Sequence, residues 1–205
     1  AGKAQDIRAG FAAAELSRDF SWVRLRLSAL AASGDKDPFD DRATGFDAIL
    51  ENPQFAGADT SFWIRQAVPL AGGGGVALSG RNGVLPSLRS SKDQGQSNFV
   101  NPGILLLGVG GDADLLPELR MSANVSWLRF QDTTVLGVLR NQAPPDREIG
   151  WDVSASLQWR PFMSQNVVLN ASAAALLPGK GLEQLYDEDR RGPQYSILVN
   201  LLLNY

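Results

Sequence analysis

The clearest pattern in the chain is an alternation of apolar and polar residues over 148–160, E-I-G-W-D-V-S-A-S-L-Q-W-R. One row holds Trp151, Val153, Ala155, Leu157 and Trp159, and the other holds Asp152, Ser154, Ser156, Gln158 and Arg160. A strand sends successive side chains to opposite faces, so these rows predict one apolar and one polar face. The two tryptophans would lie about 26 Å apart at roughly 3.3 Å per residue. With a tilt of about 40°, this length matches the apolar band of ~25 Å, bounded by aromatic girdles, of an outer-membrane barrel.

Eight further segments also have the pattern of strands: residues 4–15, 20–33, 61–70, 76–81, 103–113, 119–131, 165–177 and 195–205. In residues 20–33, leucines alternate with Arg24 and Arg26, which suits an apolar exterior and a wet interior. Residues 4–15 are also rich in helix-forming alanine. We favour a strand there because the alternation continues through a turn at 17–19. Pro69 should end or bulge the strand over 61–70.

The connections between these strands alternate in length. Short ones are predicted at 17–19, 71–75, 114–118 and 161–164, and long ones at 34–60, 82–102, 132–147 and 178–194. Bacterial barrels have short periplasmic turns, long external loops and an even number of strands. We therefore expect an all-β, antiparallel, up-and-down transmembrane β-barrel over residues 1–205. The count of about nine strands predicts that N-terminal strands are missing, or that 76–81 is not a strand.

The composition removes several classes of function. The chain has no cysteine and no histidine, which argues against a serine or cysteine triad, a zinc site or a haem site. The net charge of −3 and the lack of a basic excess argue against nucleic acid as a partner. No apolar run is long enough for a transmembrane helix. We expect no enzyme activity, no catalytic residue, no cofactor and no metal.

Each of three local motifs has a purely structural and a functional interpretation. The acidic loop with Asp35, Asp37, Asp40 and Asp41 could bind calcium, but it lacks the order of an EF-hand loop, so a solvated loop is favoured. The glycines of 72–75 open no helix and lack the lysine of a phosphate-binding loop. The glycines of 108–111 are better explained as small residues beside a crowded neighbour than as a dinucleotide site.

The last strand, Y-S-I-L-V-N-L-L-L-N-Y, resembles the C-terminal insertion signal of bacterial outer-membrane proteins. That resemblance implies recognition by the barrel-assembly machinery through the strand ending at Tyr205, and contact with the lipid bilayer and lipopolysaccharide. The segments 44–57, 61–66 and 85–103 are similar to stretches of the alginate-export porins. These are larger barrels that pass an anionic polysaccharide through an arginine-lined pore, so this chain would be roughly a C-terminal half.

The strand register predicts a lumen lined by more arginines than acids. The inward positions are Arg8, Arg24, Arg26, Arg65, Arg120, Asp152 and Arg160. A water-filled channel lined by cations concentrates anions. We therefore expect a porin-like channel of the bacterial outer membrane for passive passage of an anionic solute or polysaccharide. Under the competing interpretation, these arginines pair with acids on missing strands or only stabilise the wall.

Two other architectures stay open. A barrel could house or anchor a plug or partner protein without a free pore, with the small-residue faces of 103–113 and 165–177 in contact with it. A soluble all-β domain is the competing fold. It would have to bury Trp151, Trp159, Tyr195 and Tyr205 in a core, whereas a barrel leaves these side chains at the lipid interface.

Overall fold

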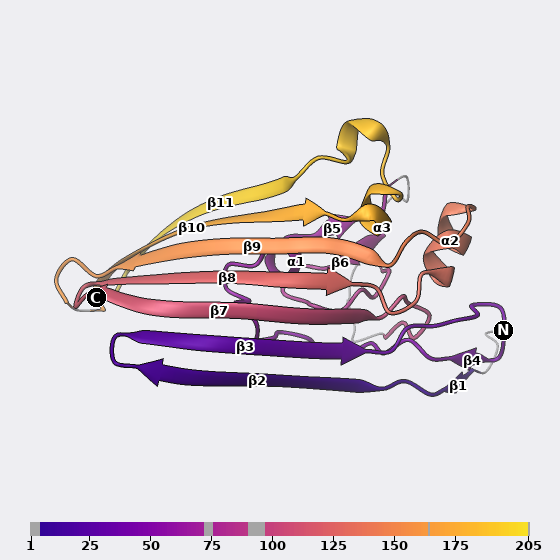
Figure 1. Ribbon diagram of the computed structural model, residues 1–205, viewed down its shortest axis with the longest axis horizontal. Coiled ribbons are helices and arrows are strands. Elements are labelled where there is room, and N and C mark those ends of the chain that lie inside the picture. Colours follow the sequence, from indigo (N-terminus) through magenta and orange to yellow (C-terminus); the bar gives the residue numbers. More distant parts are fainter. Residues whose placement is uncertain (1–4, 72–75, 90–96, 164, 205) are drawn as a thin grey trace.

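The computed structural model describes residues 5–71, 76–89, 97–163 and 165–204. Its dominant element is a seven-stranded antiparallel sheet with the strand order β11-β10-β9-β8-β7-β3-β2 (Figure 1). Its strands are β2 (Phe11–Phe20), β3 (Val23–Ala32), β7 (Ile104–Leu116), β8 (Leu119–Arg129), β9 (Glu148–Trp159), β10 (Val167–Pro178) and β11 (Gln194–Leu203). Every strand pairs with the next one of the sheet along the chain, so the fold is an up-and-down meander.

The smaller elements lie between these strands. Residues 33–103, here called the insertion, connect β3 to β7 and contain β4 (Arg42–Ala43), α1 (Phe62–Arg65), β5 (Val68–Pro69) and β6 (Ala77–Ser79). The other elements are β1 (Asp6–Ile7), α2 (Thr134–Arg140), α3 (Lys180–Glu183) and the 3-10 helix η2 (Glu188–Arg190). No described helix has the length and apolar character needed to cross a membrane.

The predicted asymmetry of the connections is present in part, because the predicted connections 34–60, 71–75 and 82–102 all fall within the insertion. The turns after β2, β7 and β9 are short and lie at one end of the sheet, and the insertion, 130–147 and 179–193 lie at the other end (Figure 1). We call these the turn end and the loop end. The boundaries of β7 to β11 agree with the predicted strands to within a few residues. Tyr205 and the predicted glycine turn at 72–75 lie outside the described residues.

Two sequence predictions about the first half of the chain are wrong. Residues 61–70 form α1 and the two-residue β5, and β5 pairs only with β6 in a separate two-stranded sheet. The main sheet therefore has seven strands instead of nine. In addition, β2 begins at Phe11 and continues through the predicted turn at 17–19 to Phe20. Phe11 then faces the insertion, where its ring stacks on Phe46 with centroids 5.0 Å apart.

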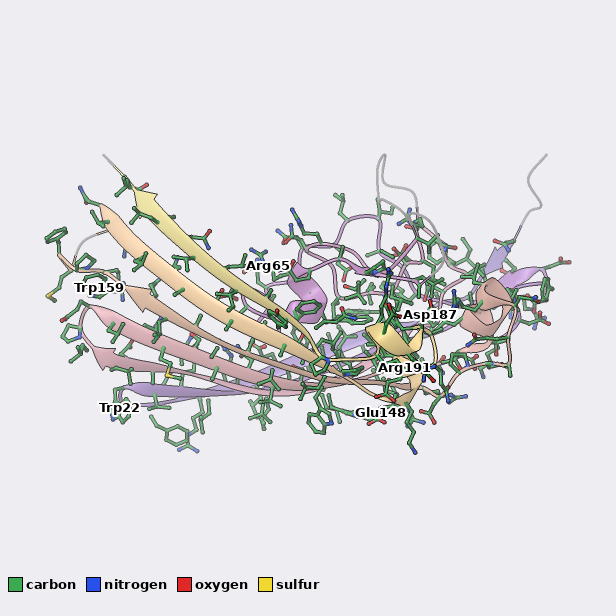
Figure 2. The ribbon with its side chains drawn as sticks, turned by 90° about the horizontal axis from the view of Figure 1, so that it is seen from above. Trp22, Arg65, Glu148, Trp159, Asp187 and Arg191 are labelled. Atoms are coloured by element: carbon green, nitrogen blue, oxygen red, sulfur yellow. The ribbon has the colours of Figure 1, made fainter. Side chains whose placement is uncertain are left out.

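The two faces of the sheet have opposite surroundings. The row from Trp151 to Trp159 is largely exposed, and Trp151 retains 48% of its accessible surface. In the opposite row, Asp152 and Ser154 are buried against the insertion. Figure 2 shows the sheet curving, with the insertion on its concave side. We therefore call the two sides the covered face and the uncovered face.

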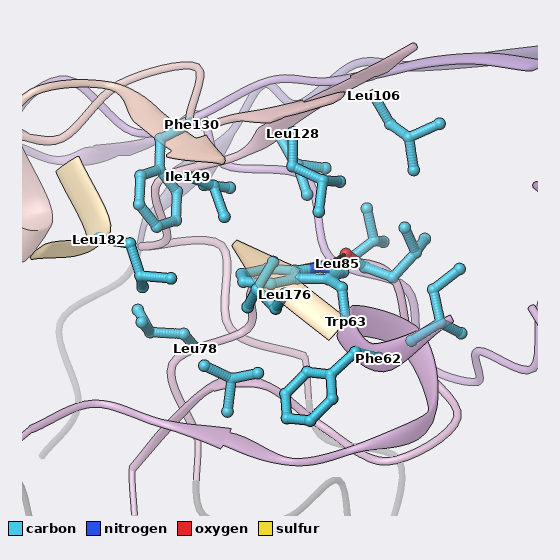
Figure 3. Packing of buried hydrophobic residues seen from close by; sticks show 14 of the residues in the cluster. Phe62, Trp63, Leu78, Leu85, Leu106, Leu128, Phe130, Ile149, Leu176 and Leu182 are labelled. Carbon is cyan, nitrogen blue, oxygen red and sulfur yellow. Dashed lines mark hydrogen bonds between the residues drawn. The ribbon is translucent and has the colours of Figure 1, made fainter. Parts of the chain in front are cut away.

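A hydrophobic core joins the insertion to the loop half of the covered face (Figure 3). From the sheet, Leu106, Leu128 and Leu176 contribute, and from the insertion Phe62 and Trp63. Trp63 is fully buried, and its indole Nε1 donates a hydrogen bond to the Val84 carbonyl at 2.9 Å. At the loop end, the side chains of β7 on the covered face are apolar because they belong to this core. This explains why the sequence of residues 103–113 is apolar on both faces.

A second contact fixes the insertion to the connection after β10. The Tyr186 hydroxyl donates a hydrogen bond to the Pro69 carbonyl of β5. Burial raises the pKa of Tyr186 to about 12, so the phenol remains protonated and able to donate at alkaline as well as neutral pH. The insertion is thus held both by the sheet and by a loop-end connection.

Candidate functional site

The turn half of the covered face holds a polar cavity of about 480 Å³ beside the insertion. Strands β3, β7, β8, β9, β10 and β11 form one wall, and residues of the insertion form the other. The charged lining residues are Arg24, Arg26, Asp59, Arg65, Asp112 and Arg120. The polar lining residues include Thr60, Ser122, Ser156, Gln158, Asn170, Ser172 and Asn200. Four of the arginines predicted to line a pore therefore meet in one cavity.

The three arginines on the sheet are each paired with an aspartate. Arg24 donates hydrogen bonds from Nε and Nη2 to the two carboxylate oxygens of Asp19, at 2.6 and 3.1 Å. Arg120 does the same with Asp114, at 2.8 and 3.2 Å. Such two-pronged ion pairs occupy the Nε/Nη2 edge of each guanidinium and balance its charge with a carboxylate of the wall. The cationic excess expected from the register is therefore largely neutralised at the wall.

Arg26 is held deeper in the wall than the other two. Its Nη1 donates to Asp112 at 2.9 Å, and its Nη2 donates to the Asn124 side-chain oxygen at 2.9 Å. Ser122 donates to the other oxygen of Asp112 at 2.7 Å. The competing interpretation, in which arginines pair with acids, thus describes the three sheet arginines, although the acids come from neighbouring strands of this chain.

Arg65 has a different position from the one predicted. It ends α1 on the insertion instead of lying on a strand, and its Nη1 donates to the Asn82 side-chain oxygen at 2.7 Å. Figure 2 shows it at the margin of the insertion, beside the turn half of the covered face. The cavity therefore receives one arginine from the segment opposite the sheet.

Asp152 does not line the cavity but anchors the insertion. Its carboxylate is 3% exposed and accepts hydrogen bonds from Ser61 Oγ at 2.7 Å, the Phe62 backbone N–H at 3.2 Å and the Trp63 backbone N–H at 2.6 Å. The first N–H groups of a helix have no partner within the helix. Asp152 satisfies the first two of these in α1 and so fixes the insertion to β9.

We expect Asp152→Ala to loosen the insertion. Three buried donors would lose their acceptor, at a cost on the order of 3 kcal/mol in the free energy of local unfolding. Limited trypsin digestion should then cut within residues 57–89. Ser154→Ala is the matched control, because it removes only the bond to Thr60 Oγ1, 2.9 Å long, from the same strand face. Equal protease resistance of Asp152→Ala and the wild type would contradict the anchoring role.

The two remaining predicted residues lie outside the cavity lining. Arg160 follows β9 at the turn end, and its backbone N–H donates to the Glu118 carbonyl at 2.8 Å. Arg8 lies beyond the N-terminal end of β2 and forms an exposed ion pair with Asp6 at 2.8 Å. Arg8 is not brought together with the arginines of the cavity, whereas Arg160 lies within electrostatic range of Asp114, the partner of Arg120.

The small residues of 108–111 and the acidic loop also have local explanations. A Cβ at Gly110 would lie 2.2 Å from Asn124 Oδ1, so the crowded-neighbour interpretation is confirmed there. Asp35 is buried and accepts from the Thr44 backbone N–H at 3.2 Å, while Asp40 accepts from the Arg42 backbone N–H at 2.7 Å. Within the described ranges, no three acidic side chains gather as a metal-ligand set.

The uncovered face is an apolar band with aromatic residues at both ends. Trp127 and Trp151 lie directly opposite each other on β8 and β9 at the loop end. Trp22 and Trp159 lie at the turn end (Figure 2). Between these ends the exposed residues include Leu25, Leu27, Leu107, Val109, Val125, Val153, Leu157, Ile197, Val199 and Leu201. A hollow of about 890 Å³ on this face is lined almost entirely by apolar atoms.

Comparison with known proteins identifies no relative of this chain. No protein-family model matches the chain, and no curated protein or solved structure is significantly similar to it. The argument for function therefore rests on the two faces of the sheet and on the cavity.

Proposed function

We propose that this chain forms part of the wall of a bacterial outer-membrane β-barrel whose lumen passes small polar solutes, preferentially anions. The observation that carries the proposal is the inverted sheet, which exposes its apolar face and covers its polar face. In water, a contiguous exposed apolar surface of this extent is unfavourable, and monomeric soluble proteins rarely have one. Against lipid, the same surface is in its preferred environment.

Two features of the uncovered face favour lipid over a second protein layer. Tryptophans at both ends of the band match the two interfaces of a bilayer, where an indole ring keeps an apolar body and a polar N–H in contact with suitable surroundings. The long connections all lie at one end, as in barrels with external loops. Lipopolysaccharide would then surround the loop-end girdle, and the barrel-assembly machinery would recognise the strand ending at Tyr205.

The proposed barrel needs further strands. In the described residues, β2 and β11 are the edges of an open sheet, and seven strands are fewer than the eight of the smallest bacterial barrels. Unpaired strand edges cannot face lipid, because each free N–H or C=O would cost several kcal/mol there. We therefore propose that additional strands bond to both edges and complete the wall around the insertion.

The test is electrical conductance. Protein extracted in detergent from the cells that make it, then added to a planar lipid bilayer, should produce stepwise increases in conductance. In a potassium chloride gradient, the zero-current potential should show a preference for chloride. Incorporation into liposomes without any conductance would eliminate the channel, and failure to incorporate would eliminate the membrane wall as well.

A barrel closed by a bound segment is the second candidate, and the insertion favours it. The insertion already occupies the loop half of the covered face through a hydrophobic core, so the free lumen would be limited to the polar cavity and its surroundings. A polysaccharide, as the resemblance to alginate-export porins implies, would need this segment to move. Conductance that appears only when the insertion is loosened, as in Asp152→Ala, would identify this closed form.

A further inference from the structure

The charged residues of the cavity fall into two groups that the sequence alone does not separate. Arg24, Arg26 and Arg120 lie on the sheet, and each forms an ion pair with an aspartate of the same sheet. Arg65 and Asp59 lie on the insertion. Within the part of the chain that the structure describes, the Asp59 side chain has no hydrogen-bonded or ionic partner, and the Arg65 guanidinium bonds only to the neutral Asn82.

Ion pairing decides which of these charges a solute experiences. A paired arginine and aspartate present a dipole, whose field falls off faster with distance than that of a single charge. Salt at physiological strength screens what remains over about 8 Å. The local potential in the cavity is therefore set mainly by the two unpaired charges of the insertion, positive around Arg65 and negative around Asp59, although the sheet contributes more arginines.

We propose that Arg65 is the residue that selects solutes in this cavity, and that it binds the carboxylate of a small hydroxylated anion. This proposal rests on the proposed channel function and names the solute class of the same cavity. Arg65 keeps unused guanidinium N–H donors for a charge-assisted hydrogen bond to a carboxylate. Asp59 opposes it and moderates the affinity, so that a bound anion can leave again.

The wall opposite Arg65 explains why the anion should carry hydroxyl groups. Ser156, Gln158, Asn170 and Asn200 line the cavity with hydroxyl and amide groups, which both donate and accept hydrogen bonds. Among the residues that the structure describes, no aromatic ring contributes to this lining. A solute with several hydroxyl groups can form hydrogen bonds with these wall groups. A simple carboxylate has no hydroxyl groups, so the wall groups would bond to water instead.

The test uses gluconate as the probe, with acetate and glucose as comparisons. Gluconate should block the chloride current at lower concentrations than acetate, and glucose should block least. Arg65→Gln should raise the half-blocking concentration of gluconate by about tenfold or more, which is the loss of one charge-assisted hydrogen bond. Asp59→Asn should lower it, because the variant removes the unpaired negative charge of the cavity.

Two further variants make the test specific. The paired double variant Asp19→Asn with Arg24→Gln should change the half-blocking concentration much less than Arg65→Gln does. Arg8→Gln, which removes an exposed arginine outside the cavity, is the control for loss of one positive charge. The proposal is overturned if the paired double variant has the larger effect, or if Arg65→Gln leaves the gluconate block unchanged.

The proposal can fail separately from the channel function. If the protein conducts but gluconate blocks no better than acetate, the channel stands and the selection by Arg65 is wrong. If the protein does not conduct, calorimetric titration of gluconate into the detergent-solubilised protein still reports on Arg65. Binding that Arg65→Gln weakens would keep the site, and an absence of binding would overturn it.

Discussion

Replacing Ala155 by arginine is expected to remove most of the protein from the membrane. Ala155 lies midway between Trp151 and Trp159 on the uncovered face, next to Ala123 and Ala173 of the neighbouring strands. An arginine on the lipid face of a barrel costs about 2–4 kcal/mol near the bilayer midplane. Carbonate-washed membranes should therefore contain several-fold less of Ala155→Arg than of the wild type, with the missing protein degraded or aggregated.

The matched control is Ser156→Arg, one residue further along β9. Its side chain faces the polar cavity, where water and the neighbouring acids can accommodate a charge. We expect this variant to reach the membrane at a level close to that of the wild type. If the uncovered face is exposed to water instead, Ala155→Arg should change stability by no more than about 0.5 kcal/mol and fractionate normally, as surface substitutions do. That result would end the membrane proposal.

The second large effect is expected at Trp63, the centre of the core between the insertion and the sheet. Trp63→Ala removes a fully buried ring and its bond to Val84, and such truncations cost about 3–5 kcal/mol. The insertion should then detach locally while the seven strands remain paired. Trypsin should cut after Arg65 or Arg81 under native conditions, and the conductance of each channel should increase as the lumen widens.

Two variants control the experiment on Trp63. Trp63→Phe keeps most of the buried volume and loses the indole donor, so it should show an intermediate rate of cleavage. Phe39→Ala removes an aromatic ring that is 75% exposed on the same insertion, and it should behave like the wild type. If Trp63→Ala is cleaved no faster than Phe39→Ala, the insertion is held by other contacts than this core.

The strands of the sheet could be predicted because each has one apolar row and one polar row. In β3, the alternation of leucines with Arg24 and Arg26 identified both the strand and its faces. The alternation failed in residues 61–70, because α1 depends on the carboxylate of Asp152, which lies far away in the sequence. It also failed near Phe11, because an alanine-rich segment has little hydrophobic difference between its two rows.

The candidate site could be predicted only in part. The register assigned Arg24, Arg26 and Arg120 to the covered face, but their partners were missed. Asp19 and Asp114 fall in segments that have the composition of turns, and Asp112 is the only charged residue in a glycine-rich apolar segment. The interaction of these acids with arginines depends on pairing between strands, which a single sequence does not specify. The position of Arg65 in the cavity likewise depends on how the insertion folds back over the covered face of the sheet.

The insertion leaves the sheet and returns to it at nearly the same point. Near its two ends, the Asp35 backbone N–H donates to the Asn101 carbonyl at 2.8 Å, and β3 and β7 pair as if a short turn joined them. The entropy cost of closing such a loop grows only with the logarithm of its length. A change in the length of this segment therefore has little effect on the register of the sheet, so the sheet and the segment that covers it are separable in sequence.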